Sequence, residues 1–499
     1  MSNFIGNDGE ERRENARWQR MLQWLVDEHG MAGDEVNLRV VGRRAQDTGG
    51  RGLFALKSCQ PSTTLFTIPA KAMITVKTLS TIYPSKTLQV LNPVQLLSMH
   101  MFLHRPTGDE DSGDPVFGPY ISTLPRDFGS HPLTWMLAST TKHALHEVLT
   151  SSLPPASHAA LQTIYTRFWE DWKAVCEYLK ASPAVVMLSS KHDVKQSQFD
   201  TSSRHLQDHF LWAWLNLNTR CIYYRLNVDQ SAQENMAMCP ILDFANHASL
   251  NSHIIPVMPN SLFSPVPGSR KSGKKTATMG GDYMFISSGR SIQEGDELFL
   301  QYGAHPNRKL FIEYGFVNVF NEGNCLGGDF IGEVDLQDIL EEMFEKRGGS
   351  VGRWMKGVLE EEGYWGDWTV HSSPTPAHPS YRLMAALRLY HIVPESTHSV
   401  PRNAEELVDA WRRVLIGQEE RVSEANEQAW RKSLLRICEE IIGRANGGME
   451  NLEGELTTLK TKRTPGWLDW MAGNIQLLWR EELEVAEAVT ISVRSGEEF

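Results

Sequence analysis

Tyr302 ends a stretch in which an apolar run lies between two chain reversals. Leu298-Phe299-Leu300 follows a turn at Glu294-Gly295-Asp296, and Gly303 lets the backbone turn sharply after the tyrosine. We expect a hairpin, with a first strand near Phe285 and a second strand that delivers one phenol to an enclosed position. With a pKa of about 10, a phenol is a poor base at neutral pH, so it would orient a reacting group. A core tyrosine beside a turn glycine explains this segment alone equally well.

A second polar group is Asp243-Phe244-Ala245-Asn246-His247, which follows the apolar pair Ile241-Leu242. We expect a strand to carry this group into the interior, where polar side chains need hydrogen-bond partners. The amide of Asn246 and the ring of His247 suit the amino-acid end and the purine of a nucleoside-type ligand. A polar turn that caps its own backbone is the alternative.

Metal binding is a third option for this region. Asp243, His247 and His253 could supply ligands, but no further ligand cluster accompanies them, so no metal is expected. His205 and His209 are four apart on a predicted helix, yet they lack the glutamate that a zincin needs directly after the first histidine. We expect them to be ordinary helix residues.

The elements that must position these residues change in type along the chain. Residues 10–29 carry apolar side chains at helical spacing and predict an amphipathic helix that ends at Gly30. The short strands predicted next are Val36–Val41, Gly52–Ala55 and Thr64–Ile68. From about Asn92 to Tyr224 the pattern is mostly helical, which indicates a helical insertion between two β portions.

The second half of the chain returns to strands and then becomes helical. Residues 259–282 are rich in Pro, Gly and Ser and predict a surface loop. Its basic cluster at 270–275 is either a nuclear import signal or a solvated part of that loop. From about Asp335 onward we predict helical structure almost throughout, with the longest periodic stretches at Tyr381–Tyr390, Ala404–Ile442 and Trp467–Val489.

Length and composition bound the class of protein. The 499 residues suffice for about two to four domains, and we predict one at 1–330, with the insertion at about 90–230, and one at 331–499. The net charge of -12 argues against a nucleic-acid binder and favours basic protein partners. Six cysteines without paired spacing and no apolar window long enough for a bilayer lead us to expect no membrane segment and a cytoplasmic or nuclear location.

Taken together, the motifs resemble those of the SET-domain methyltransferases. In chain order, they are Thr48-Gly49-Gly50-Arg51-Gly52-Leu53-Phe54-Ala55, Asn218-Thr219-Arg220, Asp243 to His247, and Tyr302 to Phe316. The chain is similar in particular to the subgroup with the RuBisCO large-subunit lysine methyltransferase, the fungal ribosomal-protein lysine methyltransferases and the actin-histidine methyltransferase. The resemblance implies an α+β fold, in which a SET β-fold with a pseudoknot and a helical insertion is followed by an all-helical C-terminal domain.

The resemblance also implies S-adenosylmethionine as the cofactor and a role for each matching position. The positions expected to bind the cofactor are Gly50, Arg51, Gly52, Leu53, Arg220, Asp243, Asn246, His247 and Phe316. Among them, Arg220 would hold the cofactor carboxylate and Phe316 would stack on the adenine. Tyr302 would be the catalytic tyrosine. Tyr314, two residues before Phe316 on the same side of an extended strand, would line the substrate pocket.

The activity implied is methyl transfer to lysine of a folded non-histone protein, with ribosomal and translation proteins as candidates. A histidine acceptor and a catalytically silent SET-like interaction module are the alternatives. Lys77 stands near a position where some relatives have an acidic cofactor contact, and Ala248-Ser249 follows Asn-His where chromatin-directed relatives have a cysteine. Spacing does not specify the substrate protein, the number of methyl groups added or the oligomeric state.

Overall fold

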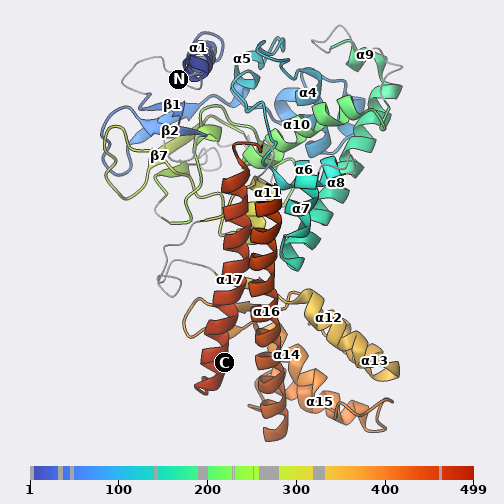
Figure 1. Ribbon diagram of the computed structural model, residues 1–499. Coiled ribbons are helices and arrows are strands. Elements are labelled where there is room, and N and C mark those ends of the chain that lie inside the picture. The colour runs from blue at the N-terminus through green and yellow to red at the C-terminus, as the bar shows by residue number, and fades with distance from the viewer. Residues whose placement is uncertain are drawn as a thin grey trace, which may run out of the picture. The chain divides into compact units, whose positions relative to one another are not determined.

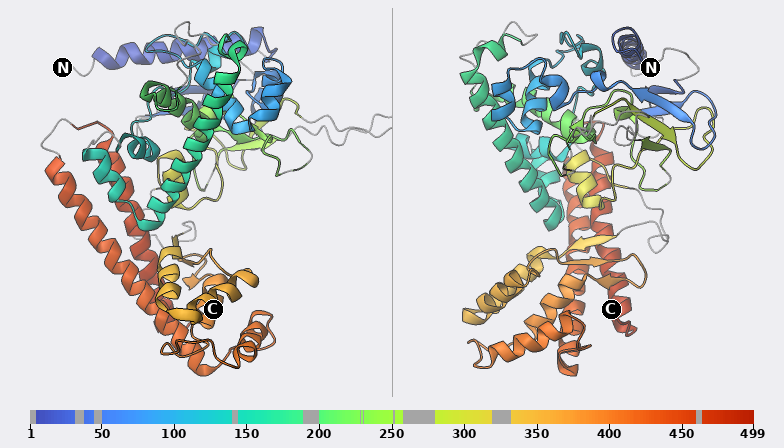
Figure 2. Two further views of the ribbon diagram at one scale, coloured as in Figure 1. Left: turned by 90° about the vertical axis from the view of Figure 1, so that its right-hand side faces the viewer. Right: turned by 180° about the vertical axis from the view of Figure 1, so that it is seen from behind.

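The computed structural model describes residues 5–31, 38–44, 50–139, 144–188, 200–227, 229, 231–250, 252–257, 280–318, 332–459 and 464–499. Contacts divide the chain into two compact units. Unit 1 is Met1–Gly129 with Thr166–Ala304, and unit 2 is Ser130–Tyr165 with His305–Phe499. Figures 1 and 2 show the elements of both units from different sides. The domain boundaries given above stay a prediction.

Unit 1 combines small antiparallel sheets with a group of helices (Figure 1). Its elements are α1 (Ile5–Asp27), β1 (Val40–Arg44), β2 (Arg51–Ala55), β3 (Thr64–Ile68), η1 (Ala70–Ala72), α2 (Val76–Leu79), α3 (Ser85–Val90), α4 (Pro93–Leu103), α5 (Gly118–Ile121), α9 (Pro183–Val186), α10 (Arg204–Arg220), β4 (Ile222–Tyr223), β5 (Met236–Ala237), η3 (Leu242–Phe244), β6 (Ile254–Val257) and β7 (Tyr283–Ser287). Helix α8 (Pro155–Ala181) contributes to both units.

The three-stranded sheet of unit 1 joins β3 to strands that are distant from it in sequence. Strands β3, β7 and β6 lie in that order, with β7 antiparallel to both neighbours, and β1 pairs with β2. In β7 the residues alternate between buried and partly buried, which is the period-two pattern of a strand with one face on the core. Because β7 is central, both of its edges are already paired.

Several predicted elements of unit 1 are found. The predicted strands at Gly52–Ala55 and Thr64–Ile68 coincide with β2 and β3. The opening helix α1 is followed by Gly30 with a φ of 69°, a left-handed conformation that terminates helices. Most of the loop predicted at 259–282, including the basic cluster at 270–275, lies outside the described residues, as does the start of the strand predicted at Val36–Val41.

Unit 2 is mainly helical. Its elements are α6 (Pro132–Ser139), α7 (Ala144–Ser151), α11 (Asn307–Tyr314), β8 (Glu333–Asp335), α12 (Gln337–Lys346), α13 (Gly349–Glu361), β9 (Thr369–His371), β10 (His378–Pro379), α14 (Tyr381–Tyr390), α15 (Ala404–Leu415), α16 (Glu424–Leu459) and α17 (Leu468–Arg494). The long helices α16 and α17 lie side by side in both figures (Figures 1 and 2).

Two expectations for this unit need correction. The C-terminal region is not all helical, because β8, β9 and β10 form an antiparallel sheet in the order β10-β9-β8. The stretch Ala404–Ile442 is not one helix but parts of α15 and α16. The break follows from Gly417, whose φ of 72° is left-handed and ends α15. The predicted helix at Tyr381–Tyr390 coincides with α14.

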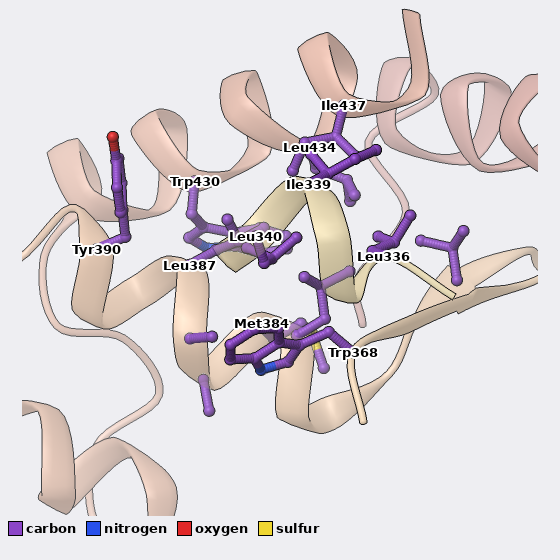
Figure 3. Close-up of a cluster of buried hydrophobic side chains, with 14 of the residues drawn as sticks. Leu336, Ile339, Leu340, Trp368, Met384, Leu387, Tyr390, Trp430, Leu434 and Ile437 are labelled. Atoms are coloured by element: carbon purple, nitrogen blue, oxygen red, sulfur yellow. The ribbon is translucent and has the colours of Figure 1, made fainter. Parts of the chain in front are cut away.

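The core of unit 2 joins helices and sheet. Figure 3 shows Leu340 of α12, Leu387 of α14 and Trp430 of α16 in one cluster, with Trp368 of the segment before β9 beside them. All four side chains are fully buried. Burying a large apolar side chain stabilises a fold by about 1.5–3 kcal/mol, so this cluster anchors the C-terminal helices. In the part of the chain that the structure describes, no helix has the length and apolarity needed to cross a membrane.

Candidate active site

The segment that ends at Tyr302 is hydrogen-bonded to β2. Ala55 donates from its backbone nitrogen to the carbonyl of Asp296 at 2.9 Å, and Leu298 donates to the carbonyl of Leu53 at 2.7 Å. The hairpin expected between this segment and the strand near Phe285 is therefore wrong. Strand β7, which contains that strand, has β3 on one edge and β6 on the other and cannot accept a third partner. The predicted turn at Glu294-Gly295-Asp296 is present, with Gly295 at a φ of 89°.

The same segment also pairs with the Asn246–His247 motif. Leu300 donates to the carbonyl of Asn246 at 2.9 Å, and Ala248 donates to the carbonyl of Leu300 at 3.1 Å. His247 and Leu300 form a parallel bridge. The chain near Leu300 is thus bonded to two earlier segments, β2 and the Asn-His motif, as a pseudoknot requires.

The backbone before the Asn-His motif is a tight turn and not the strand that we expected. Ile241 has a φ of 68°, and η3 follows it directly. A left-handed backbone at a β-branched residue costs about 1–3 kcal/mol, and such strain persists only where the surroundings enforce it. Ile241 and Leu242 are buried, which supplies that enforcement.

Asn246 and His247 use their side chains to hold neighbouring segments together. The Nδ2 of Asn246 donates to the carbonyl of Arg51 at 3.2 Å and to Oε1 of Glu297 at 2.7 Å. The Nδ1 of His247 accepts from the backbone nitrogen of Tyr302 at 3.1 Å. The two motifs that the sequence analysis singled out are therefore in direct contact. Glu297 also belongs to this site, although the sequence analysis did not name it as a site residue. Its place in the same segment as Tyr302 was the feature that could have identified it.

Tyr302 is half-buried and its position is fixed by a hydrogen bond. Its Oη donates to the carbonyl of Ala245 at 2.8 Å, and its ring lies 5.1 Å from the ring of His247, measured between centroids. Gly303 follows with a φ of 147°. The predicted sharp turn after the tyrosine is therefore present.

The glycine motif lies at the start of β2. Gly50 is exposed in the bend that precedes the strand, and Leu53 is fully buried. A Cβ on Gly52 would lie 2.5 Å from Oε1 of Glu297, closer than real Cβ contacts allow. A side chain at this position would therefore displace the Glu297 carboxylate that Asn246 binds.

Two arginines and a carboxyl group meet beside this motif. Arg220, the last residue of α10, donates from Nη1 to the carbonyl of Asp243 at 2.7 Å. The Arg51 guanidinium lies 4.4 Å over the ring of Phe244, and its Nη1 donates to the Thr123 carbonyl at 3.4 Å. Most of this cluster is withdrawn from solvent.

Several polar atoms of the cluster lack hydrogen-bond partners among the described residues. They are Nε and Nη2 of Arg51, Nε of Arg220 and Oδ1 of Asp243, all buried. Such unmade bonds cost about 1–3 kcal/mol each, and buried polar atoms without partners are rare in folded proteins. Buried guanidinium nitrogens without partners suit a ligand carboxylate, and a buried carboxyl oxygen without a partner suits a ligand ammonium group.

Burial raises the pKa of Asp243 to about 6, and Arg220, the Tyr120 hydroxyl and Arg51 act against that rise. Tyr120 is fully buried, and burial raises the pKa of its phenol. Sequence analysis did not identify Tyr120, because an apolar setting on the short helix α5 gave no sign of a polar neighbour.

Tyr314 and Phe316 belong to unit 2, whereas the residues described above belong to unit 1. The extended strand expected through them is wrong. Tyr314 is the last residue of α11, and Gly315 caps that helix with a φ of 82°. The Tyr314 and Phe316 rings are neighbours, with centroids 6.2 Å apart. Their roles at the substrate and the adenine stay predictions.

The histidines considered for metal binding do not form a ligand group. Nδ1 of His253 accepts a hydrogen bond from the backbone nitrogen of Phe299 at 3.2 Å. Like His247, this histidine therefore binds the backbone of a neighbouring segment. His205 and His209 are neighbours on α10, with ring centroids 4.1 Å apart. Among the described residues, the group of ligand types that does converge is His100, His104 and Asp114, which sequence analysis missed.

Comparison with known proteins decides the family. The sequence profile of the SET domain matches residues 50–303, just over half of the chain. The chain belongs to the SET-domain family. The match begins at Gly50 and ends at Gly303, so it contains the glycine motif, Arg220, the Asn-His motif and Tyr302. The predicted α+β SET fold is thereby confirmed.

Three relatives show where this SET-domain protein has its similarity. Ribosomal lysine N-methyltransferase set11 of Schizosaccharomyces pombe is 29% identical over 190 residues, which are 38% of this chain and 38% of that protein. Ribosomal lysine N-methyltransferase 2 of Saccharomyces cerevisiae is 29% identical over 278 residues, 54% of this chain and 52% of that protein. SET domain-containing protein 4 of Homo sapiens is 23% identical over 455 residues, 89% and 86% of the respective chains. The chain thus spans about half or less of the two named methyltransferases.

Solved structures share the fold. The SET domain of LSMT bound to lysine and AdoHcy superposes with a TM-score of 0.54 at 15% identity, over 96% of this chain and 93% of that chain. Rubisco LSMT bound to sinefungin and monomethyllysine gives a TM-score of 0.53 at 14% identity, over 97% and 94%. The comparisons therefore confirm the resemblance to the SET-domain subgroup stated from the sequence.

Proposed function

We propose that this SET-domain protein transfers methyl groups from S-adenosylmethionine to lysine side chains of a non-histone protein. The observation that carries the proposal is the convergence in unit 1 of the glycine motif, the Arg220 and Asp243 cluster and Tyr302 through one pseudoknot. Two relatives are named ribosomal lysine N-methyltransferases, which supports lysine as the acceptor and a ribosomal protein as a substrate.

The residues present fit the amino-acid end of this cofactor. A carboxylate would satisfy Nε of Arg220 and Nε and Nη2 of Arg51, which lack partners among the described residues. The cofactor's ammonium group would satisfy the buried oxygen of Asp243. Gly52 and the backbone at Leu53 would pass close to the methionine part, and Asn246 and His247 would close the other side.

S-adenosylmethionine would supply a methyl group on a sulfonium. In-line displacement by the neutral amine of lysine would form the N–C bond and break the S–C bond, leaving a neutral thioether and a methylated ammonium. The enzyme has to align the reacting atoms and exclude water. Tyr302 suits alignment, because its hydrogen bond to Ala245 and the His247 bond to its backbone fix the phenol. An O–H that donates to a carbonyl carries more negative charge on its oxygen, which favours a nearby positively charged methyl group. We therefore assign Tyr302 to orientation and electrostatic support and not to deprotonation.

The proposed partner is a lysine-bearing protein. A net charge of -12 supports attraction of basic protein segments and disfavours nucleic acid. The ribosomal names of two relatives agree with a cytoplasmic or nuclear location for the reaction. We do not assign a metal to the methyl-transfer step, because in-line transfer to a neutral amine needs alignment and desolvation.

Calorimetry with S-adenosylmethionine followed by labelling of cell extract tests the proposal. Wild type should release heat on binding and transfer labelled methyl groups to a protein band. The Tyr302→Phe variant should keep binding and lose labelling. A protein that neither binds the cofactor nor labels any band would be the silent interaction module, and the proposal would be wrong.

Mass spectrometry that localises the modified residue decides between acceptors. A methylated lysine supports the proposal, and a methylated histidine replaces it with the histidine alternative. Tyr223→Phe is the matched control, because Tyr223 is 49% exposed on the short strand β4 and removing its hydroxyl should leave labelling unchanged.

A further inference from the structure

His100, His104 and Asp114 form a buried cluster outside the candidate active site. Their exposed fractions are 0%, 2% and 6%. The two histidines lie one helical turn apart, His100 in α4 and His104 at the C-cap of that helix. Asp114 comes from the loop between α4 and α5, both labelled in Figure 1.

The fold holds each of the three side chains in place. Helix α4 begins with a capping box between Asn92 and Gln95, which fixes its start. Asp114 accepts through Oδ1 from the backbone nitrogens of Val116 at 2.6 Å and Phe117 at 2.8 Å. One oxygen of Asp114 thus holds the turn that precedes α5, and the other, Oδ2, faces the histidines.

The separations of the ligand atoms suit a small tetrahedral ion. Oδ2 of Asp114 lies 2.9 Å from Nε2 of His100 and 3.6 Å from Nε2 of His104. Ligands bound to zinc at about 2.0–2.1 Å with tetrahedral angles are separated by about 3.3 Å, between these two values. All candidate ligand atoms of the group lie within 4.8 Å of one another.

The hydrogen bonding of these atoms also leaves room for a shared ligand. Nε2 of His100 and Oδ2 of Asp114 are 2.9 Å apart, yet among the described residues neither has a hydrogen bond of acceptable geometry. Two buried polar atoms this close without such a bond can be satisfied by a cation between them. The Tyr83 hydroxyl is 2.9 Å from Nδ1 of His100 and fixes the orientation of that ring, as partners of metal-bound histidines do.

The residue types agree with this geometry. One carboxylate and imidazole nitrogens are ligands of the zinc class of divalent ions.

We propose that His100, His104 and Asp114 bind one zinc ion that fastens the loop between α4 and α5 to helix α4. Three side chains leave one tetrahedral position for a water molecule. The three side chains are buried, and none of them belongs to the set around Tyr302. The site is independent of the methyltransferase proposal.

The first test measures metal in the full chain, purified without a metal-affinity step and dialysed against metal-free buffer. We expect about one zinc per chain by elemental analysis. Replacement by Co²⁺ should give the visible absorption of a tetrahedral site. Removing zinc with a chelator should lower the unfolding temperature by about 5 °C, and added Zn²⁺ should restore it. A metal-poor protein that shows no cobalt band and no change in unfolding temperature would overturn the proposal.

The second test uses Asp114→Asn, which keeps the Oδ1 that accepts from Val116 and Phe117 and replaces the oxygen facing the histidines with a nitrogen. We expect the folded variant to lose the cobalt band and the response to zinc. His205→Ala is the matched control, because His205 and His209 form a two-histidine pair on α10 that could attract surface zinc. Loss of the metal signal in His205→Ala, with retention in Asp114→Asn, would assign the metal to the surface and contradict the proposal.

Discussion

Tyr302 donates from its phenol oxygen to the carbonyl of Ala245 at 2.8 Å. Ala245 directly precedes Asn246 and His247, and His247 in turn accepts from the backbone of Tyr302. The phenol and the Asn-His motif are therefore tied by reciprocal bonds, one from side chain to backbone and one from backbone to side chain. A substitution of Tyr302 or of His247 is therefore expected to shift the other side chain.

The Tyr302→Phe variant should lose methyl transfer by about 100-fold while keeping cofactor affinity within a few-fold, because one oriented polar group contributes about that much to a transition state. Single-turnover transfer of labelled methyl groups gives the rate, and calorimetry gives the affinity. The exposed Tyr223→Phe serves as control. Unchanged transfer in Tyr302→Phe would remove this tyrosine from the reaction.

Asp243 predicts a pH dependence of cofactor binding. Burial raises its folded-state pKa to about 6, so the carboxyl is neutral below that pH and ionised above it. If it binds the ammonium group of the cofactor, affinity should fall about tenfold per pH unit below 6 and stay level above it. Calorimetry between pH 5 and 8 measures this.

The Asp243→Asn variant should bind weakly at every pH and lose that pH dependence. The raised pKa of Asp243 also affects the stability of the fold, in the direction opposite to its effect on cofactor affinity. Because the folded pKa is above the unfolded value of 3.8, the contribution of Asp243 to stability is present at low pH and lost as the pH rises to about 6. An affinity profile in Asp243→Asn that matches wild type would show that another group titrates.

The Gly52→Ala variant should weaken cofactor binding through Glu297. The added methyl group would lie 2.5 Å from Oε1 of Glu297, so that carboxylate must move and release Asn246. We expect a small loss in the free energy of unfolding, because the carboxylate ends a flexible side chain that can move, and a larger loss of cofactor affinity. Gly289→Ala is the matched control, because a methyl group there meets nothing within 4 Å. Equal behaviour of the two variants would show that close approach at Gly52 is not needed.

Sequence analysis found the residues of the site better than their connections. Tyr302 and Asn246 were identified from residue type and position, and they are in one pseudoknot. Which segment pairs with the tyrosine was predicted wrongly, because alternation of apolar residues predicts a strand and not its partner. The partner depends on β7 already having both edges occupied, which is a property of the whole sheet.

One of the features that the sequence analysis missed had a clear signal in the local sequence, and the others did not. Gly315 after Tyr314 is the usual sign of a helix end, so the helix α11 was predictable. The left-handed backbone of Ile241 was not, because β-branched residues rarely adopt it. The spacing of His100 and His104 was visible, but Asp114 joins them only through the path of the intervening loop.

Glu481 on α17 predicts a pH dependence of stability within unit 2. Its side chain is 3% exposed, and burial raises its pKa to about 8 from the ordinary 4.5. A folded-state pKa above the unfolded value means that stability is greatest below pH 4.5 and is lost as the pH rises towards 8. Each pKa unit corresponds to about 1.4 kcal/mol, and the pKa of the neighbouring Glu482 is raised as well.

We expect Glu481→Gln to raise the unfolding temperature relative to wild type by about 5 °C at pH 8.5 and by less at pH 5.5. Thermal unfolding followed by circular dichroism at both values measures the difference. Glu487→Gln, at an exposed position of the same helix, should show none. If Glu481→Gln lowered the unfolding temperature at pH 8.5, the carboxylate of Glu481 would be a stabilising partner of its neighbours and not a buried group that resists ionisation.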